Sequence, residues 1–415
     1  MKIAVIGTGI SGLTTALLLN RRHDITVFEA NNYIGGHTNT VFVKDHGHTL
    51  PVDTGFIVFN ETNYPNLCQL FDRLGVESRD SDMSFSVHCE KTGLEYNGTS
   101  LNGIFSQRCN LLRPDFWIML RDILRFHDDA KISLDSGLDD QVTVADYVRS
   151  MNYSDGFVEN YLVPLGASLW SCPANRFREF PMRFVIEFMA NHHMLQVKQR
   201  PVWKTVVGGS SSYIGPLTAP YKDKIRVSTP VKQISRQLSS VKLTLSDGGN
   251  DEFDEVIMAT HANHALQLLE KPQTEEREML GHFEYQLNDV VLHTDTRLLP
   301  KSRTAWASWN YRIPESATDV GMVTYNMNML QGLSSEDTYC VSLNQTADID
   351  PERIIYRITY QHPQFSTGRD QVQKDHERLI RNNRISCCGA YWGFGFHEDG
   401  ISSALRVCSA FDEVL

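Results

Sequence analysis

The first 36 residues contain a glycine-rich turn between a predicted strand and a predicted helix. Residues 2–6 are short and apolar, residues 7–12 read Gly-Thr-Gly-Ile-Ser-Gly, and residues 13–19 are again apolar. In this setting a G-x-G-x-x-G turn bends at its first glycine, admits a pyrophosphate to backbone N–H groups at its second, and packs helix on strand at its third. The phosphates then lie at the positive end of the helix. The predicted contacts are Gly7, Gly9, Ile10, Ser11 and Gly12.

A second predicted strand, residues 25–29, ends in an acidic residue. Glu29 lies 22 residues after Gly7, close to the ~20-residue spacing at which a carboxylate accepts hydrogen bonds from the adenosine ribose. A carboxylate there repels a 2′-phosphate, which argues against NADP. Glycines also occur in ordinary turns, but here the strand, the helix and the acid all fall where an ADP-containing cofactor requires them. We therefore predict adenosine contacts at Glu29 and Ala30.

Composition limits the classes of partner. The chain has 415 residues, enough for two domains or one large composite domain. Its 39 basic and 50 acidic side chains give a net charge of −11, so we expect no nucleic-acid partner. The eight cysteines form no C-x-x-C pair and resemble reduced intracellular thiols. No pattern indicates a metal site.

Targeting signals are also not apparent. The first predicted strand begins at residue 2, which leaves no room for a signal peptide. No run of 18 apolar residues offers a membrane span. We therefore expect a cytoplasmic protein that can associate peripherally with the inner membrane face; the oligomeric state stays open.

A second glycine pair follows Glu29, in the sequence Gly-Gly-His-Thr-Asn-Thr of residues 35–40. FAD is long enough to run back past the first βαβ unit, so a second backbone segment free of side chains has to meet its pyrophosphate. Gly35 and Gly36 suit that contact, and His37 could donate to a phosphate oxygen. The alternative is a surface loop with two turn glycines. Together with the first turn, the pair predicts FAD.

On these motifs the chain resembles the superfamily of flavin-containing amine oxidases, phytoene desaturases and protoporphyrinogen oxidases. The superfamily's G-G-[RH]-x-x-[ST] motif appears at 35–40, its acidic-glycine flavin loop at 52–57, its G-G motif before a helix at 206–210, and two Rossmann segments at 227–234 and 253–260. The further FAD contacts that the resemblance implies are Gly35, Gly36, His37, Thr40, Thr54, Gly55, Phe56, Ile57, Val231 and Thr260.

Two other runs, residues 306–311 and 395–400, look most like a bacterial subfamily of FAD-binding oxidoreductases. Members of that subfamily are associated with cyclopropane-synthase-like lipid methyltransferases, and some desaturate methyl-branched acyl chains. The resemblance thus implies a lipid substrate and a lipid methyltransferase as a partner.

The C-terminal region predicts the flavin end of the site. A predicted strand at 385–388 leads to Gly389-Ala390, and Asp399-Gly400 is expected to open a helix over 401–411 with Asp399 as its cap. In the superfamily this helix N-terminus faces the flavin N1/C2 carbonyl, where its dipole favours the negative charge of reduction. Without the resemblance, the segment is an aromatic turn before a capped helix. The implied contacts are Gly389, Ala390, Asp399, Gly400 and Ile401.

The chain departs from the superfamily at two places. Many relatives have an acid where Ala390 follows Gly389, so one carboxylate contact to FAD is missing. Amine oxidases hold a lysine near flavin N5, which should fall within 285–294, but no lysine occurs between Lys271 and Lys301. The second departure weakens an amine oxidase interpretation.

We therefore predict an α/β plus α+β fold, in which a Rossmann-like FAD-binding domain of the glutathione-reductase type carries an inserted substrate domain of mixed sheet and helices. The FAD-binding domain is discontinuous, over residues 1–60, 205–265 and 385–415, and the substrate domain covers 61–204 and 266–384, with a helical part at about 104–200 and a strand-rich part at about 282–345. Two helical stretches, 110–126 and 184–203, mix apolar and basic residues and suit either an anionic membrane surface or the core.

The redox motifs that the sequence contains limit the possible chemistry. No second G-x-G-x-x-G follows a predicted strand and no C-x₄-C occurs, so the substrate itself has to reduce the flavin. Hydride transfer from a C–H bond to flavin N5 is the simplest reaction. Three functions remain: desaturation of a lipid acyl chain, oxidation of a small amine, and a flavin-bound scaffold for a partner enzyme. The candidate catalytic residues are His397 and His293 as proton acceptors, Asn288, and Trp309 and Tyr311 as an aromatic wall, with Trp306 and Tyr325 beside them.

Overall fold

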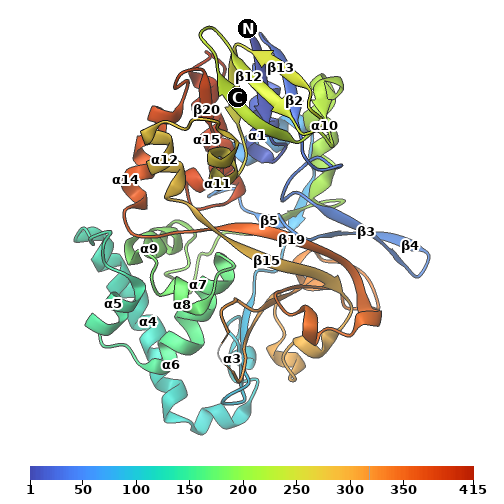
Figure 1. Ribbon diagram of the computed structural model, residues 1–415. Helices are drawn as coiled ribbons and strands as arrows, with labels where there is room; N and C mark the ends of the chain where they lie inside the picture. Colours follow the sequence, from blue (N-terminus) through green and yellow to red (C-terminus); the bar gives the residue numbers. More distant parts are fainter. Residues whose placement is uncertain (317) are drawn as a thin grey trace.

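The computed structural model describes residues 1–316 and 318–415. At the top of Figure 1 lies a five-stranded parallel sheet in the order β10-β2-β1-β14-β20. Its strands come from four separated parts of the sequence. Their bounds are β1 (Lys2–Ile6), β2 (Asp24–Phe28), β10 (Ile225–Arg226), β14 (Glu255–Met258) and β20 (Ile385–Cys387).

Both faces of this sheet are covered, as the continuous apolar character of its strands requires. Ile3 and Val5 of β1 pack with α1 (Ile10–Leu19) and α15 (His397–Ser409) in one core cluster. Ala4 and Ile6 point the other way, into a core shared with an antiparallel sheet. That sheet comprises β11 (Val231–Arg236), β12 (Val241–Leu245) and β13 (Asn250–Phe253).

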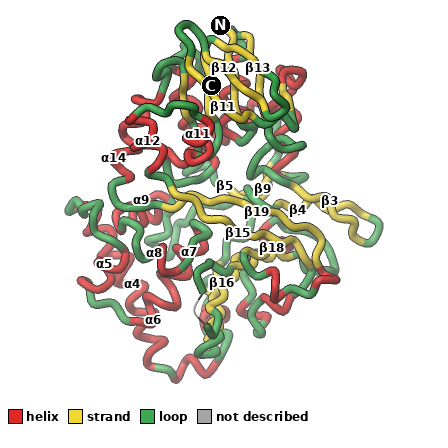
Figure 2. The backbone as a smooth tube through the Cα atoms, in the orientation of Figure 1, coloured by secondary structure: helices red, strands yellow, loops and turns green. Residues whose placement is uncertain are grey.

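A second large sheet has seven strands in the order β19-β15-β18-β17-β16-β7-β8. Neighbouring strands are antiparallel except for the β7–β16 pair. Its long strands β15 and β19 cross the middle of the molecule, below the parallel sheet in the view of Figures 1 and 2. The bounds are β7 (Phe85–Cys89), β8 (Leu94–Asn97), β15 (Glu284–His293), β16 (Trp309–Ile313), β17 (Val323–Asn326), β18 (Cys340–Leu343) and β19 (Ile354–Gln364).

A helical region packs beside this second sheet around a core rich in aromatic side chains (Figure 2). Its helices are α3 (Leu101–Ile104), α4 (Pro114–Asp135), α5 (Val144–Ser150), α6 (Asp155–Phe157), α7 (Val163–Leu169), α8 (Ala174–Phe177) and α9 (Met182–Asn191).

Both helical stretches expected here have other bounds than predicted. The 110–126 stretch divides into a 3₁₀ helix, Arg108–Leu112, and α4, because Pro114 occupies the first position of α4 and starts a new helix. The 184–203 stretch is helical only as far as Asn191, and His193 has a φ of 54° that ends the helix.

The remaining elements join these regions. A β3–β4 hairpin projects from the molecule (Figure 1), and a small three-stranded sheet, β5-β9-β6, lies at its base. These strands are β3 (Thr40–Asp45), β4 (His48–Asp53), β5 (Val58–Phe59), β6 (Ser78–Asp80) and β9 (Lys204–Val206). The other helices are α2 (Pro65–Leu74), α10 (Ile214–Thr218), α11 (Ala262–Leu268), α12 (Thr274–Gly281), α13 (Met327–Leu330) and α14 (Arg369–Lys374).

The predicted fold class is confirmed: a Rossmann-like parallel sheet is assembled from distant segments, and a mixed sheet with helices is inserted between them. The domain boundaries near 60, 205, 265 and 385 stay predictions. Within the described ranges no helix combines the length and the apolar character that a bilayer crossing needs.

One buried carboxylate connects several of these parts. Asp53, at the end of β4, is 0% exposed. It accepts hydrogen bonds from the Ser210 N–H at 2.9 and 3.0 Å, the Ser210 hydroxyl at 2.8 Å, the Thr40 hydroxyl at 2.5 Å and the Gln331 amide at 2.8 Å. Its own N–H donates to Gln331 at 2.8 Å. Burial raises the pKa of Asp53 to about 6, although these hydrogen bonds act in the opposite direction.

Replacing Asp53 should change how stability depends on pH. The raised pKa means that the folded protein holds this proton more tightly than the unfolded chain does. Proton binding at Asp53 therefore stabilises the folded state fully below pH ~4, and this stabilisation is lost as the pH rises through about 6. Asp53→Asn abolishes the titration. Between pH ~5 and pH ~7.5 the unfolding free energy of the wild type should therefore fall by about 1.4 kcal/mol relative to that of Asp53→Asn.

Urea denaturation of both proteins at the two pH values measures this double difference, in which the contributions of all other titrating groups cancel. A double difference of zero would contradict the buried, protonatable state of Asp53.

Candidate functional site

The two glycine turns meet in front of α1. Gly36 has a φ of 61°, and a Cβ on it would lie 3.1 Å from the Gly9 Cα. A Cβ on Gly12 would lie 2.0 Å from the carbonyl oxygen of Gly7, so the turn and the helix touch through backbone alone. Gly9 differs, because a Cβ there meets no atom within 4 Å in the described chain. Open space therefore lies before the N-terminus of α1, which has no side-chain cap.

Glu29 lies beside this turn and contacts Thr8. Its carboxylate, 7% exposed, accepts hydrogen bonds from the Thr8 N–H at 3.0 Å, the Asn31 N–H at 2.9 Å and the Asn31 side chain at 3.0 Å, and from the Thr8 hydroxyl. These four bonds occupy the acceptor sites of the carboxylate. A ribose would thus compete with the side chains of Thr8 and Asn31 for Glu29.

The other adenosine-side predictions lie around the same turn. The Thr260 methyl would be 3.5 Å from a Cβ on Gly7, whose φ is 102°. Ala30 is exposed directly after Glu29, and Val231 is half-buried at the start of β11. Thr260 therefore borders the pyrophosphate turn, whereas Val231 belongs to the neighbouring antiparallel sheet.

The segment after the second glycine pair is fixed by the flavin loop. The N–H of Phe56 donates to the His37 carbonyl at 2.8 Å, and that of Thr54 to the Asn39 carbonyl at 3.0 Å. A Cβ on Gly55 would lie 2.1 Å from the His37 oxygen, so glycine is required there. Ile57 follows in the core cluster of the seven-stranded sheet. The structure thus brings the 35–40 and 52–57 motifs together.

Helix α15 starts earlier than predicted. It begins at His397, and Asp399 is its third residue rather than its cap. The Asp399 carboxylate still accepts the N–H of Phe396 at 2.9 Å, and burial raises its pKa to about 6. A Cβ on Gly400 would lie 2.8 Å from the Ile10 side chain, so α15 contacts α1 at the predicted residues 400 and 401. The N–H of Gly389 donates to the Ser403 hydroxyl of α15 at 2.9 Å, and Ala390 begins a 3₁₀ turn.

Four histidines gather where these segments converge; we call His37, His261, His362 and His397 the histidine cluster. Ring centroids of His37 lie 5.4 Å from His362 and 5.9 Å from His261, and His37 stacks on Tyr360 at 4.7 Å. Within the described structure the Nε2 of His37 has no hydrogen-bond partner. His397 stacks on Phe56 at 3.7 Å, with its Nε2 3.1 Å from the Thr38 hydroxyl.

Desolvation lowers the pKa of all four imidazoles, to about 4 for His362 and about 3 for the other three. All four nevertheless keep some solvent exposure. Strong desolvation with residual exposure means that they line an enclosed space and are neutral at physiological pH. Low pKa values make all four imidazoles, His397 included, weak bases that can take a proton only from a strongly acidic group.

Sequence reasoning missed His261 and His362. His261 lies three residues after the end of β14, and the carboxyl end of a parallel strand is where such sheets bind ligands, so its position carried a signal. His362 lies on β19, a strand that was not predicted from the sequence.

Asn288 lies behind the cluster. Its amide donates to the Nδ1 of His362 at 2.8 Å and accepts from the Asn344 side chain at 2.7 Å, and Asn288 is 0% exposed. Asn288 therefore orients the His362 ring, with the proton on Nε2, and does not reach the enclosed space itself.

The remaining candidates lie along the seven-stranded sheet. His293 is fully buried at the far end of β15, where its Nδ1 accepts the Asp295 N–H at 3.0 Å and its Nε2 donates to Ser342 at 2.8 Å. Both nitrogens are engaged, so we no longer propose His293 as a proton acceptor. Trp309 and Tyr311 share one face of β16, as predicted, and the Trp309 ring lies 4.9 Å from Tyr325. Trp306 donates instead to the Pro300 carbonyl at 2.7 Å.

Three potential metal ligands, Asp45, His46 and Asp337, come together at the β3–β4 hairpin in the described part of the chain. His46 and Asp337 are exposed there and form an ion pair, with 3.7 Å between His46 Nε2 and the carboxylate. This group lies outside the site of the glycine turns.

The residues around the glycine turns fit FAD. Gly9 leaves open space at the end of α1, Gly36 brings the second turn to it, and the unpartnered Nε2 of His37 offers a polar contact. Together with the fold, these features define the class of flavin-dependent oxidoreductases.

Comparison with known proteins gives the family. Residues 10–332 match the family described as flavin containing amine oxidoreductase, and the chain belongs to this family. The chain is therefore a flavin-dependent oxidoreductase, and FAD is its cofactor.

Among curated relatives, the tryptophan 2-monooxygenase of Allorhizobium ampelinum is 37% identical over 103 residues, which are 24% of this chain and 14% of the relative. The zeta-carotene desaturase of Capsicum annuum is 33% identical over 78 residues, 19% of this chain and 13% of the relative. The matches thus span a small part of these relatives' length.

Solved structures match over the whole chain. A putrescine oxidase variant superposes with a TM-score of 0.69 at 15% identity, covering 99% of this chain and 98% of that one. A fatty acid isomerase from P. acnes that produces CLA gives 0.68 at 15% identity with the same coverage. At 15% sequence identity, this structural similarity establishes the fold alone.

Gly9→Val should yield folded protein without flavin. The valine side chain meets no protein atom within 4 Å of its Cβ and the φ of −66° suits an L residue, but it fills the space left for the pyrophosphate. We expect less than about a tenth of the wild-type flavin per protein, measured by absorbance after purification. Gly98→Val, also unobstructed but far from the turns, is the control and should stay yellow. A yellow Gly9→Val protein would contradict the site.

Proposed function

We propose that the protein introduces a double bond into the acyl chain of a lipid. The observation that carries the proposal is the neutral, aromatic character of the site's lining. Phe188 stacks on Phe396 at 5.1 Å, next to the start of α15, and the histidine cluster is uncharged. The two acids of the first turn of α15 are engaged: Glu398 accepts from Asn66 and Leu67, and Asp399 from Phe396.

Bound FAD supplies the chemistry that the chain lacks, since it accepts the hydride and its two electrons. The carbon that loses the hydride becomes electron-deficient, which makes the C–H bond on the neighbouring carbon strongly acidic. A neutral imidazole of the histidine cluster can take this proton despite its low pKa, and the electrons of that C–H bond form the double bond. The aromatic side chains keep water away from the electron-deficient carbon.

Several relatives support a long, apolar substrate. Carotene desaturases and a fatty acid isomerase are named for long apolar chains. Tryptophan 2-monooxygenase and putrescine oxidase are named for amines and favour the alternative, oxidation of a small amine. Against that alternative, β15 contains no lysine, and a substrate ammonium would face neutral imidazoles. A lipid methyltransferase remains our proposed partner.

Anaerobic mixing of the FAD-loaded protein with candidate substrates tests the reaction. Phospholipids with methyl-branched or unsaturated chains should bleach the flavin absorbance near ~450 nm, because FAD takes up the hydride. Bleaching by small amines alone would refute the lipid proposal. No bleaching with any substrate, together with a stably co-purifying enzyme, would favour the scaffold alternative.

The same assay tests the histidine cluster. His261→Gln should keep its flavin but slow bleaching by about 100-fold or more, as loss of a proton acceptor does. His261 Nδ1 donates to the Gln361 side-chain oxygen at 3.4 Å, so its Nε2 lone pair is free to take a proton. His46→Gln, at the exposed hairpin, is the matched control and should react at the wild-type rate. An unchanged rate in His261→Gln would remove His261 from the mechanism.

We further propose that the start of α4 contacts an anionic membrane at the cytoplasmic face. Leu112 is 88% exposed and Trp117 is 48% exposed. The Trp117 indole donates to the Leu111 carbonyl at 3.0 Å, which holds it beside the exposed Leu111 and Leu112 in one apolar patch. Arg113 and Arg121 flank the patch and suit anionic headgroups.

Charge in this patch should weaken membrane binding. Leu112→Glu combined with Trp117→Glu should lower sedimentation with anionic liposomes at low salt by about tenfold, because both apolar insertion and charge attraction are lost. Leu238→Glu, equally exposed on the β11–β12 turn, is the control. Wild-type protein that stays in the supernatant would refute membrane contact.

A further inference from the structure

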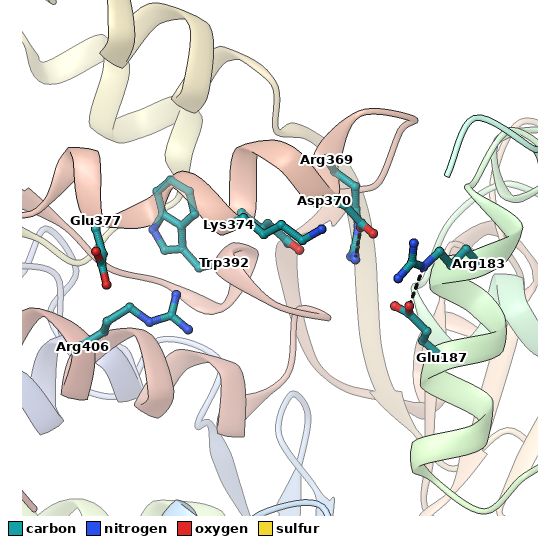
Figure 3. A pocket seen from close by; sticks show the side chains of 9 residues that line it. Arg183, Glu187, Arg369, Asp370, Lys374, Glu377, Trp392 and Arg406 are labelled. Carbon is teal, nitrogen blue, oxygen red and sulfur yellow. Dashed lines mark hydrogen bonds and ion pairs between the residues drawn. The ribbon is translucent and has the colours of Figure 1, made fainter. Parts of the chain in front are cut away.

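A pocket of about 510 Å³ lies between α9, α14 and α15. Figure 3 shows Arg183 and Glu187 of α9 on one side and Arg369, Asp370 and Lys374 of α14 on the other. It is separate from the glycine turns and from the histidine cluster, and neither cofactor binding nor the proposed chemistry uses it.

Arg369 has an unused donor in this pocket. The residue is 5% exposed, and its guanidinium lies 3.7 Å above the ring of Phe184. Its Nε donates to Asp370 at 2.8 Å and its Nη2 lies 2.7 Å from the same carboxylate. Its buried Nη1 has no partner anywhere in the described chain. A buried cationic donor without an acceptor costs folding free energy, so the position requires an explanation.

Trp392 presents a second such donor from another element. It is 6% exposed, and its ring stacks on His376 at 4.1 Å. Its Nε1 also lacks an acceptor among the described residues. Two buried, unpartnered donors that line one pocket indicate a ligand rich in acceptor atoms.

The charges around the pocket favour an anionic ligand. Lys374 and Arg406 add two cations to Arg183 and Arg369, opposite three acids, Glu187, Asp370 and Glu377. Two of the acids are already paired, Glu187 with Arg183 at 2.7 Å and Asp370 with Arg369. Arg406 donates to the Nδ1 of His376 at 3.3 Å, and Glu377 balances one of the two remaining cations. Lys374 and the free Nη1 of Arg369 remain for a carboxylate or a phosphate.

Aromatic rings connect this pocket with the start of α15. Phe184, beneath the Arg369 guanidinium, stacks on Phe394 at 5.1 Å, and Phe188 stacks on Phe396 at 5.1 Å. Phe396 directly precedes His397. These packed rings thus form a continuous apolar connection between Arg369 and the histidine cluster.

We propose that the pocket binds the anionic head, a carboxylate or a phosphate, of an acyl substrate, with Arg369 and Trp392 as its hydrogen-bond donors. The proposal rests on the lipid acyl chemistry proposed above and adds where the polar end of that substrate is recognised. The two sources of the anion, a free fatty acid and a phospholipid, share this chemistry and are separated by experiment.

Calorimetric titration of the FAD-loaded protein tests the site with three probes: sodium oleate, monomeric dihexanoylphosphatidylglycerol and inorganic phosphate. We expect oleate or the phosphatidylglycerol to bind, and Arg369→Lys and Trp392→Phe each to weaken that binding by about tenfold or more, as loss of one hydrogen bond to a charged group does. Arg353→Lys, an exposed arginine at the start of β19, is the matched control and should bind normally. Unchanged flavin content and melting temperature show that the variants fold.

The proposal would be overturned if both variants bound oleate and phosphatidylglycerol with the affinity of the wild type. It would also be overturned if the wild type bound inorganic phosphate but neither amphiphile. The flavin assay separates this result from a failure of the proposed function. If the function holds and the pocket binds the head, Arg369→Lys raises the KM for the acyl lipid by about tenfold and leaves kcat unchanged. If no lipid bleaches the flavin, the calorimetric result still decides whether the pocket binds the anion.

Discussion

Direct contact between backbone segments is the constraint on which the cofactor site depends. Gly12 against the Gly7 carbonyl and Gly55 against the His37 carbonyl leave no room for a Cβ, and Gly36 against Gly9 leaves little. Three segments can converge on one cofactor only because side chains are absent at these points. The buried Asp53 then fixes the converged segments, since it binds Ser210, Thr40 and Gln331 at once.

The same convergence sets the electrostatics of the site. The four imidazoles of the histidine cluster share an enclosed space in which each protonated ring would be desolvated, so all four stay neutral. The carboxylates nearby are held by backbone N–H groups. Neutral imidazoles beside stacked aromatic rings favour a substrate that is apolar where it reacts, and the separate pocket at Arg369 supplies cationic groups.

Much of the cofactor site was predictable because its signals are local. The spacing of Gly7, Gly12 and Glu29 follows from the geometry of one βαβ unit, and the structure places them together. The start of α15 was misplaced by four residues, because Asp399 acts from the third helical position, where its carboxylate reaches back to Phe396. A capping acid looks the same in sequence at either position.

The active-site candidates were harder to predict because their surroundings depend on tertiary packing. His293 and His362 look alike as sequence, but one has both nitrogens bonded within a sheet and the other faces an enclosed space. Likewise, the open donors of Arg369 and Trp392 appear only when α9 and α14 are brought together.

The order of segments in the parallel sheet has a consequence for biosynthesis. β20, which completes the sheet beside β14, and α15, which packs on α1, lie more than 370 residues after the first glycine turn. While the chain is still being translated, the turn at Gly7 therefore exists without its partner helix. FAD can be captured in full only after the ribosome has passed residue 400, which makes flavin insertion a step that follows synthesis of nearly the whole chain.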